Sequence, residues 1–135
     1  MDDVAVNKAA AIERCVHRVR EVFANDPRNL REDLTRQDSI ILNIQRACEA
    51  AIDLAMHQVR RHKLGIPQDS REAFALLANA SLYPTDSAAK LSRMVGFRNV
   101  AVHDYQTLNL DVVAEIIRTH LDDLTAFASW ALKLG

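Results

Sequence analysis

Residues 38–67 read DSIILNIQRACEAAIDLAMHQVRRHKLGIP, and this stretch decides the fold class. Its apolar side chains recur every three or four residues, at Ile41, Ile44, Cys48, Ile52, Ala55 and Val59. That spacing is typical of one face of an α-helix. Asp38 or Ser39 is expected to cap the helix start, because short polar side chains accept hydrogen bonds from free backbone amides. Gly65 and Pro67 are expected to end the helix.

The same spacing predicts four further helices around this one. They run from near Val4 to Asn25, from Ser70 to the break at Tyr83-Pro84, from Asp86 to about Tyr105, and from Asn109 or Asp111 almost to the carboxyl terminus. The polar residues 28–37 have room for a helical turn. Only three Gly and three Pro occur, which argues against a sheet that needs frequent turns. We predict one all-α domain, residues 1–135, built as an antiparallel bundle of about five helices.

The charge of the chain is nearly balanced. Seventeen Lys and Arg face eighteen Asp and Glu, and no acidic or basic tail is present. A nucleic-acid partner would therefore have to be held by a local patch of positive charge. Thirteen of the basic residues are arginine, which is compatible with such a patch.

The cysteines and the amino terminus predict a cytoplasmic protein. Cys15 and Cys48 lie in apolar helical patterns and belong to no metal-like cluster. No apolar run approaches the roughly 20 residues of a membrane span. Residues 1–10 are acidic and lack the apolar core of a signal peptide. We therefore expect reduced thiols that pack in the core.

The apolar pattern breaks at residues 94–105, MVGFRNVAVHDY. At about 100° per residue, one helix stripe holds Leu91, Val95, Arg98, Val102 and Tyr105. Arg98 therefore interrupts an apolar face. Together with Asn99, His103 and Tyr105 it occupies an arc of about 160° on that helix. The pattern predicts four polar groups on one side of the helix.

Arginine and histidine at this spacing have a chemical use on RNA. His103 can accept or donate the proton of a ribose hydroxyl, while Arg98 stabilises charge that develops on the phosphate, without a metal. A structural interpretation competes with this one. In it, Arg98 makes a salt bridge or an interface contact, Asn99 and His103 form a hydrogen-bonded pair, and Tyr105 is an amphipathic surface aromatic.

The polar side of the long predicted helix offers a partner for Arg98. It carries Arg46, Glu49, Asp53, His57 and Arg60, a set that is typical of an exposed ladder of ion pairs. Either Glu49 or Asp53 could instead point toward Arg98 and set its orientation. We take Asp53, with Asn99, as a supporting residue of the candidate site.

The residues Arg98-Asn99-x-x-x-His103-x-Tyr105 resemble the Arg-x4-His-x-Tyr motif of HEPN domains, specifically the HepT-like toxins of HEPN/MNT toxin–antitoxin systems. Segments 37–43 (QDSIILN), 46–50 (RACEA), 64–68 (LGIPQ) and 94–98 (MVGFR) resemble that family at similar intervals. The resemblance implies a HEPN-type homodimer whose motif helices line a shared RNA-binding cleft. It further implies a metal-independent endoribonuclease acting on cellular tRNA or mRNA, with Arg98 and His103 catalytic and Asn99 supporting them.

The resemblance also implies a protein partner. HepT-like toxins are neutralised by MntA, a minimal nucleotidyltransferase antitoxin that transfers AMP from ATP onto the motif tyrosine, which is Tyr105 here. Each AMP would place a phosphate charge and a nucleoside beside Arg98 and His103 and so exclude RNA. Two other functions stay open: a non-catalytic module that binds RNA, a nucleotide or its partner, and a helical scaffold that only dimerises.

Overall fold

A computed structural model describes residues 2–134, and its regular elements are all helical over that range. In chain order they are α1 (Asp3–Phe23), α2 (Arg28–Arg31), α3 (Leu34–Arg61), α4 (Ser70–Asn79), α5 (Thr85–His103), the 3-10 helix η1 (Tyr105–Thr107), α6 (Leu110–Glu115), the π-helical segment η2 (Ile116–His120) and α7 (Leu121–Leu134). The last three follow one another without a break. The predicted all-α class, with five main helices and one short turn, is therefore confirmed. Met1 and Gly135, the ends of the expected domain 1–135, lie outside the described residues.

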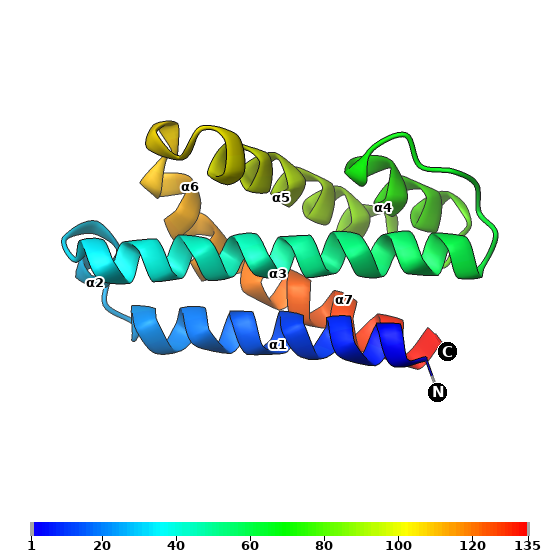
Figure 1. Cartoon of the computed structure of the whole chain (residues 1–135), viewed down its shortest axis with the longest axis horizontal. Coiled ribbons are helices and arrows are strands. Elements are labelled where there is room, and N and C mark those ends of the chain that lie inside the picture. Colours follow the sequence, from blue (N-terminus) through cyan, green and yellow to red (C-terminus); the bar gives the residue numbers. More distant parts are fainter. Residues whose placement is uncertain (1, 135) are drawn as a thin grey trace.

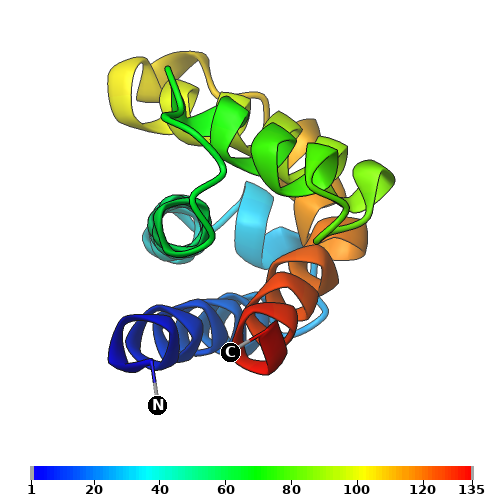
Figure 2. The ribbon, with the colours of Figure 1, turned by 90° about the vertical axis from the view of Figure 1, so that its right-hand side faces the viewer.

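The long helix α3 is the centre of the bundle. It contacts α1, α4, α5 and α7, and α1 runs antiparallel to it (Figure 1). Seen end-on, α1 and α7 lie on one side of α3, and α4 and α5 lie on the other (Figure 2). The inward side of α5 therefore packs against α4, α3 and α7.

The core is aliphatic along α3 and aromatic beside α7. The predicted face of the long helix is buried throughout: Ile41, Ile44, Cys48, Ile52, Ala55 and Val59. The aromatic cluster consists of Phe74, Tyr83, Phe127 and Trp130, with ring centroids 4.7 to 5.4 Å apart. The indole N–H of Trp130 also donates to the carbonyl of Leu82 at 2.9 Å, which ties α7 to the α4–α5 connection. No helix among residues 2–134 has the length and apolarity to cross a membrane.

The start of α3 differs from the prediction. The helix begins at Leu34, and the Asp33 carboxylate caps it by accepting a hydrogen bond from the amide of Arg36 at 3.1 Å. Asp38 and Ser39, the expected caps, lie inside the helix. Leu34 is 69% exposed, so the first turn carries no apolar period that could have revealed it in the sequence. Asp38 is thereby left free for a different contact.

The other helix starts agree with the prediction to within one residue. Asp69 caps α4 in place of Ser70, and α5 begins at Thr85 in place of Asp86. Asn109 caps α6 as predicted, through its side-chain oxygen. Where two capping residues are adjacent in sequence, local propensity does not choose between them.

The end of α5 is the larger deviation. The helix stops at His103, because Asp104 takes an extended φ of −152° with ψ 57°, and Tyr105 starts η1. The buried side of α5 is formed by Ala88, Leu91, Met94, Val95, Phe97 and Ala101. The predicted stripe is correct at Leu91 and Val95 but wrong at Val102, which is 45% exposed. Tyr105 consequently reaches the rest of the protein from a turn, not from the helix stripe.

Candidate active site

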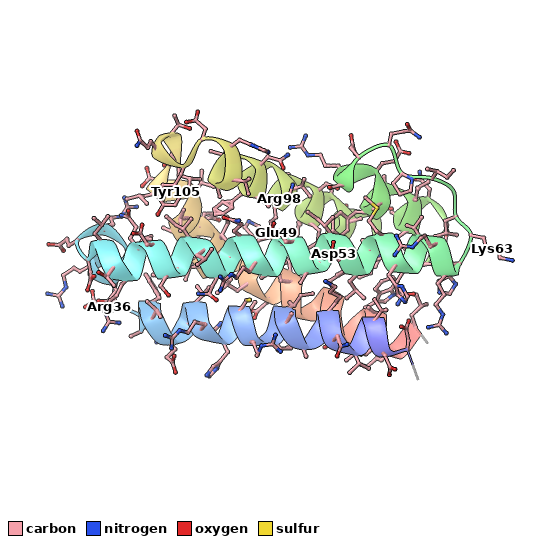
Figure 3. The ribbon with its side chains drawn as sticks, in the orientation of Figure 1. Arg36, Glu49, Asp53, Lys63, Arg98 and Tyr105 are labelled. Atoms are coloured by element: carbon pink, nitrogen blue, oxygen red, sulfur yellow. The ribbon has the colours of Figure 1, made fainter. Side chains whose placement is uncertain are left out.

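Arg98 projects from α5 toward α3 and faces Glu49 (Figure 3). Its Nε atom lies 3.8 Å from Oε2 of Glu49, and the two side chains are 27% and 39% exposed. Its Nη1 donates to Oδ1 of Asn99 at 2.9 Å. The Nε–H has no hydrogen-bond partner within residues 2–134. Arg98 is therefore oriented by one carboxylate and one amide. The donors that remain for a ligand are those of its Nη atoms, because the Nε–H is buried.

Glu49, not Asp53, is the acidic neighbour of Arg98. Asp53 lies one turn further along α3, and its Oδ2 accepts from Nζ of Lys8 in α1 at 2.9 Å. The expected contact between Asp53 and Arg98 is thus not formed. Residues four apart share one side of a helix, so the sequence admitted both carboxylates, and the position of α5 along α3 selects Glu49.

His103 is the last residue of α5, and its side chain is exposed. The structural interpretation required a hydrogen bond between Asn99 and His103, but the Asn99 oxygen accepts from Arg98 instead. Over the part of the chain that the structure describes, no hydrogen bond holds the imidazole or joins it to Arg98. Both ring nitrogens of His103 are therefore open to a substrate hydroxyl in a single copy of the chain.

Tyr105 lies over the amino-terminal part of α3, on the same side of that helix as Arg98 (Figure 3). Its hydroxyl donates a short hydrogen bond to Oδ1 of Asp38. Burial and the neighbouring carboxylate raise the pKa of Tyr105 to about 12, although the residue is 40% exposed. At neutral pH the side chain is a neutral phenol that rests against a carboxylate.

Asp38 is the contact residue that the sequence reasoning missed. The residue was interpreted as a helix cap, because an acidic residue before an apolar period has that meaning most often. Its place in the segment 37–43, one of those that resemble the HepT-like family, was the only signal of another role. The contact spans 67 positions and depends on α5 ending before Tyr105.

An apolar cavity lies apart from these residues. It has a volume of about 540 Å³ and lies between α5, η1 and α6, against Phe97, Val100 and Val112. None of Arg98, Asn99, His103 and Tyr105 lines it. Within residues 2–134, no group of three or more His, Cys, Asp or Glu side chains is arranged to hold a metal ion.

A family model and a curated relative both match most of the chain. The family model described as ribonuclease HepT-like matches residues 12–130. The mRNA nuclease HepT of Shewanella oneidensis is 49% identical over 127 residues, which cover 94% of this chain and 95% of that protein.

Two solved structures are similar over essentially the whole chain. One is a tri-AMPylated Shewanella oneidensis HEPN toxin in complex with MNT antitoxin, with a TM-score of 0.92, 47% identity and 100% coverage of both chains. The other is a toxin–antitoxin crystal structure with AMP-PNP, with a TM-score of 0.92 and 46% identity, covering 99% of this chain and 100% of that one. With the family model spanning α3 and the entire Arg98–Tyr105 motif, the chain belongs to the HepT-like ribonuclease family.

Proposed function

We propose that this chain is the toxin of a HEPN/MNT toxin–antitoxin system and that Arg98 and His103 are the catalytic pair of a metal-independent endoribonuclease. The observation that carries this proposal is a partly exposed guanidinium with free Nη donors, followed five residues later by an exposed imidazole that has no hydrogen-bond partner among residues 2–134. The nuclease name of the Shewanella relative supports the reaction class. The substrate is cellular RNA, so we place the protein in the cytoplasm.

The two side chains suit cleavage by a ribose hydroxyl. His103 accepts the proton of a 2′-hydroxyl, and the oxygen attacks the adjacent phosphorus while the bond to the 5′-oxygen breaks. Arg98 stabilises the negative charge that develops on the non-bridging phosphate oxygens. Asn99 supports this geometry because its oxygen holds Nη1 of Arg98. The 5′-oxygen leaves with the bonding electron pair and takes a proton from water, so the products are a cyclic phosphate and a free 5′-hydroxyl.

A homodimer fits the surface around the motif. Val102 is 45% exposed on the last turn of α5, on the same side of the helix as Arg98. A second copy of the chain would cover this apolar side chain and bring a second motif to the same cleft. Such a cleft gathers positive charge locally in a chain whose formal net charge is −1.

Cleavage of total RNA and tRNA by the purified, unmodified protein, with a chelator present, tests the proposed reaction. We expect His103→Ala to lower the rate by about 10²- to 10⁴-fold, the usual contribution of a general acid or base. His17→Ala is the matched control, because His17 is also exposed on a helix. Equal cleavage by His103→Ala contradicts the assignment. No cleavage by unmodified wild type favours the second candidate, a non-catalytic module that binds RNA or its partner.

We also propose that an MntA-type nucleotidyltransferase neutralises the toxin by transferring AMP to Tyr105. The similar HEPN toxin is tri-AMPylated in complex with its MNT antitoxin. The chain has two tyrosines, and Tyr83 is buried in the aromatic cluster whereas Tyr105 is 40% exposed. An AMP on Tyr105 would bring a phosphate charge to the α5–α3 side where Arg98 lies.

Mass spectrometry after incubation with the antitoxin and ATP tests the modification site. We expect increments of AMP on the peptide that contains Tyr105 and unmodified protein for Tyr105→Phe. Modification of Tyr105→Phe to the wild-type extent contradicts this site. Tyr83→Phe serves as the matched control and should be modified normally.

A further inference from the structure

The contact between Tyr105 and Asp38 has no function in RNA cleavage as proposed above. It joins η1 to the second turn of α3, and the phenol donates directly to the carboxylate. Asp38 does not cap α3, because Asp33 does. Nor does Asp38 form a salt bridge within residues 2–134, whereas Asp33 pairs with Arg36 at 3.3 Å. Among residues 2–134, the Asp38 carboxylate therefore faces no cation, and its side-chain hydrogen bond is the one from Tyr105.

The chemistry of the modification requires such an acceptor. Tyr105 is a neutral phenol at neutral pH, and a phenol must lose its proton to become a competent nucleophile. A candidate base has to lie within hydrogen-bond reach of the proton that it removes. Among residues 2–134, Asp38 is the side chain that meets this condition for Tyr105.

We propose that Asp38 accepts the proton of the Tyr105 hydroxyl during adenylylation, so that the toxin supplies the base for its own neutralisation. This inference rests on the proposed modification of Tyr105. The phenolic oxygen attacks the α-phosphorus of ATP held by the antitoxin, the bond from that phosphorus to the β-phosphate bridging oxygen breaks, and pyrophosphate leaves with the electron pair. The proton moves to the Asp38 carboxylate and is then released to water.

This role is confined to the first AMP. Once the phenolic oxygen carries a phosphodiester it has no proton to lose, so further AMP units need a different acceptor hydroxyl. Substitution of Asp38 should therefore slow the first transfer and leave the rate constants of the later transfers unchanged.

The decisive variant is Asp38→Asn, followed by intact-mass spectrometry over time with the antitoxin and ATP. The Asn oxygen can still accept a hydrogen bond from Tyr105, so a residue that merely anchors the tyrosine would tolerate this change. We expect a fall of about 10²-fold in the rate of the first AMP transfer, because Asn cannot take the proton. The matched control is Glu32→Gln, which removes one exposed carboxylate from the same end of α3 and should be modified at the wild-type rate. A wild-type rate for Asp38→Asn overturns the proposal.

A second readout does not depend on the antitoxin. Titration of the tyrosine absorbance should show that Asp38→Asn lowers the pKa of Tyr105 from about 12 toward the ordinary value. An unchanged pKa overturns the contact itself, and circular dichroism confirms that the variant is folded. If wild-type protein is modified at a residue other than Tyr105, the proposed modification site fails. If Tyr105 is modified equally fast in wild type and Asp38→Asn, the modification site stands and the role of Asp38 alone is refuted.

Discussion

Leu91 in the first half of α5 is 2% exposed, whereas Val102 near the end of the same helix is 45% exposed. Core contacts to α3, α4 and α7 hold α5, and its second half still buries Phe97 and Ala101. The same half exposes Asn99 and His103 and turns Arg98 toward Glu49. The difference teaches that the last turns of α5 combine packing and chemistry, on different side chains. The buried side chains of α5 fix the direction in which the motif residues point.

Truncation of a buried side chain in the first half of α5 should have the largest effect on stability. We expect Leu91→Ala to lower the free energy of unfolding by about 2 to 5 kcal/mol, because a buried leucine loses its packing and leaves a cavity. Val102→Ala is the matched control in the exposed half and should change stability by less than about 0.5 kcal/mol. Chemical denaturation followed by circular dichroism measures both variants. Equal losses for the two would remove the distinction between the halves of α5.

Arg98→Ala should lower RNA cleavage strongly and stability only slightly. We expect RNA cleavage to fall by about 10²- to 10³-fold, the effect of removing one group that stabilises transition-state charge. Stability should change little, since Arg98 has only the Asn99 hydrogen bond and a partly exposed ion pair to lose. Single-turnover cleavage and denaturation of the same preparation give both numbers. A large loss of stability with unchanged cleavage per folded molecule would assign Arg98 to the fold.

Glu49→Gln removes the charge of the α3 carboxylate that faces Arg98 and should have a smaller effect. The carboxylate lies 3.8 Å from Arg98, and Gln removes its charge while keeping its shape. We expect a change in stability below about 1 kcal/mol, because the pair is partly exposed. KM for RNA should fall because a negative charge leaves the site, and kcat should fall because Arg98 loses its partner, each by less than about tenfold. A rise in kcat would contradict the orienting role.

The smallest effect on stability is expected from Asp2, at the far end of the bundle. Hydrogen bonds from His57, the amide of Ala5 and Arg61 hold the pKa of Asp2 well below its usual range. A carboxyl whose pKa is lowered by folding stabilises the native state above its unfolded pKa, and this stabilisation is lost as the pH falls. Asp2→Asn should therefore lower stability slightly at neutral pH and flatten its decline between about pH 5 and pH 2. RNA cleavage by Asp2→Asn should equal that of wild type. If stability falls with decreasing pH as steeply in Asp2→Asn as in wild type, the hydrogen bonds of Asp2 do not contribute to stability.

Much of the fold was predictable because the buried side chains of a helix recur every three or four residues. The apolar faces of α3 and of the first half of α5 contain Ile44, Val59 and Leu91, whose spacing reveals both the helix and its buried side. The start of α3 was not predictable, since Asp33 and Asp38 are both suitable caps and the intervening turn is exposed.

The site was predictable in its residues more than in its contacts. Arg98 and His103 stand out because they interrupt an apolar period and match a family motif. Glu49 was not separable from Asp53 in the sequence, because the axial position of α5 along α3 is a property of the packed bundle. The Tyr105 contact with Asp38 depends on a helix end at Asp104 that neither Gly nor Pro marks.

The reactivity of the Cys48 thiol can report on the packing of the helices around it. The thiol is buried in the core beside Glu49, and burial together with that carboxylate raises its pKa to about 12, although Arg98 acts in the opposite direction. A thiol reagent reacts with the thiolate, so Cys48 is inert while Leu91, Met94 and Val95 of α5 and the neighbouring Phe74 and Leu124 surround it. Its labelling rate therefore measures how often the packing around α3 opens in the native protein, and the half-buried Cys15 provides an internal reference on α1.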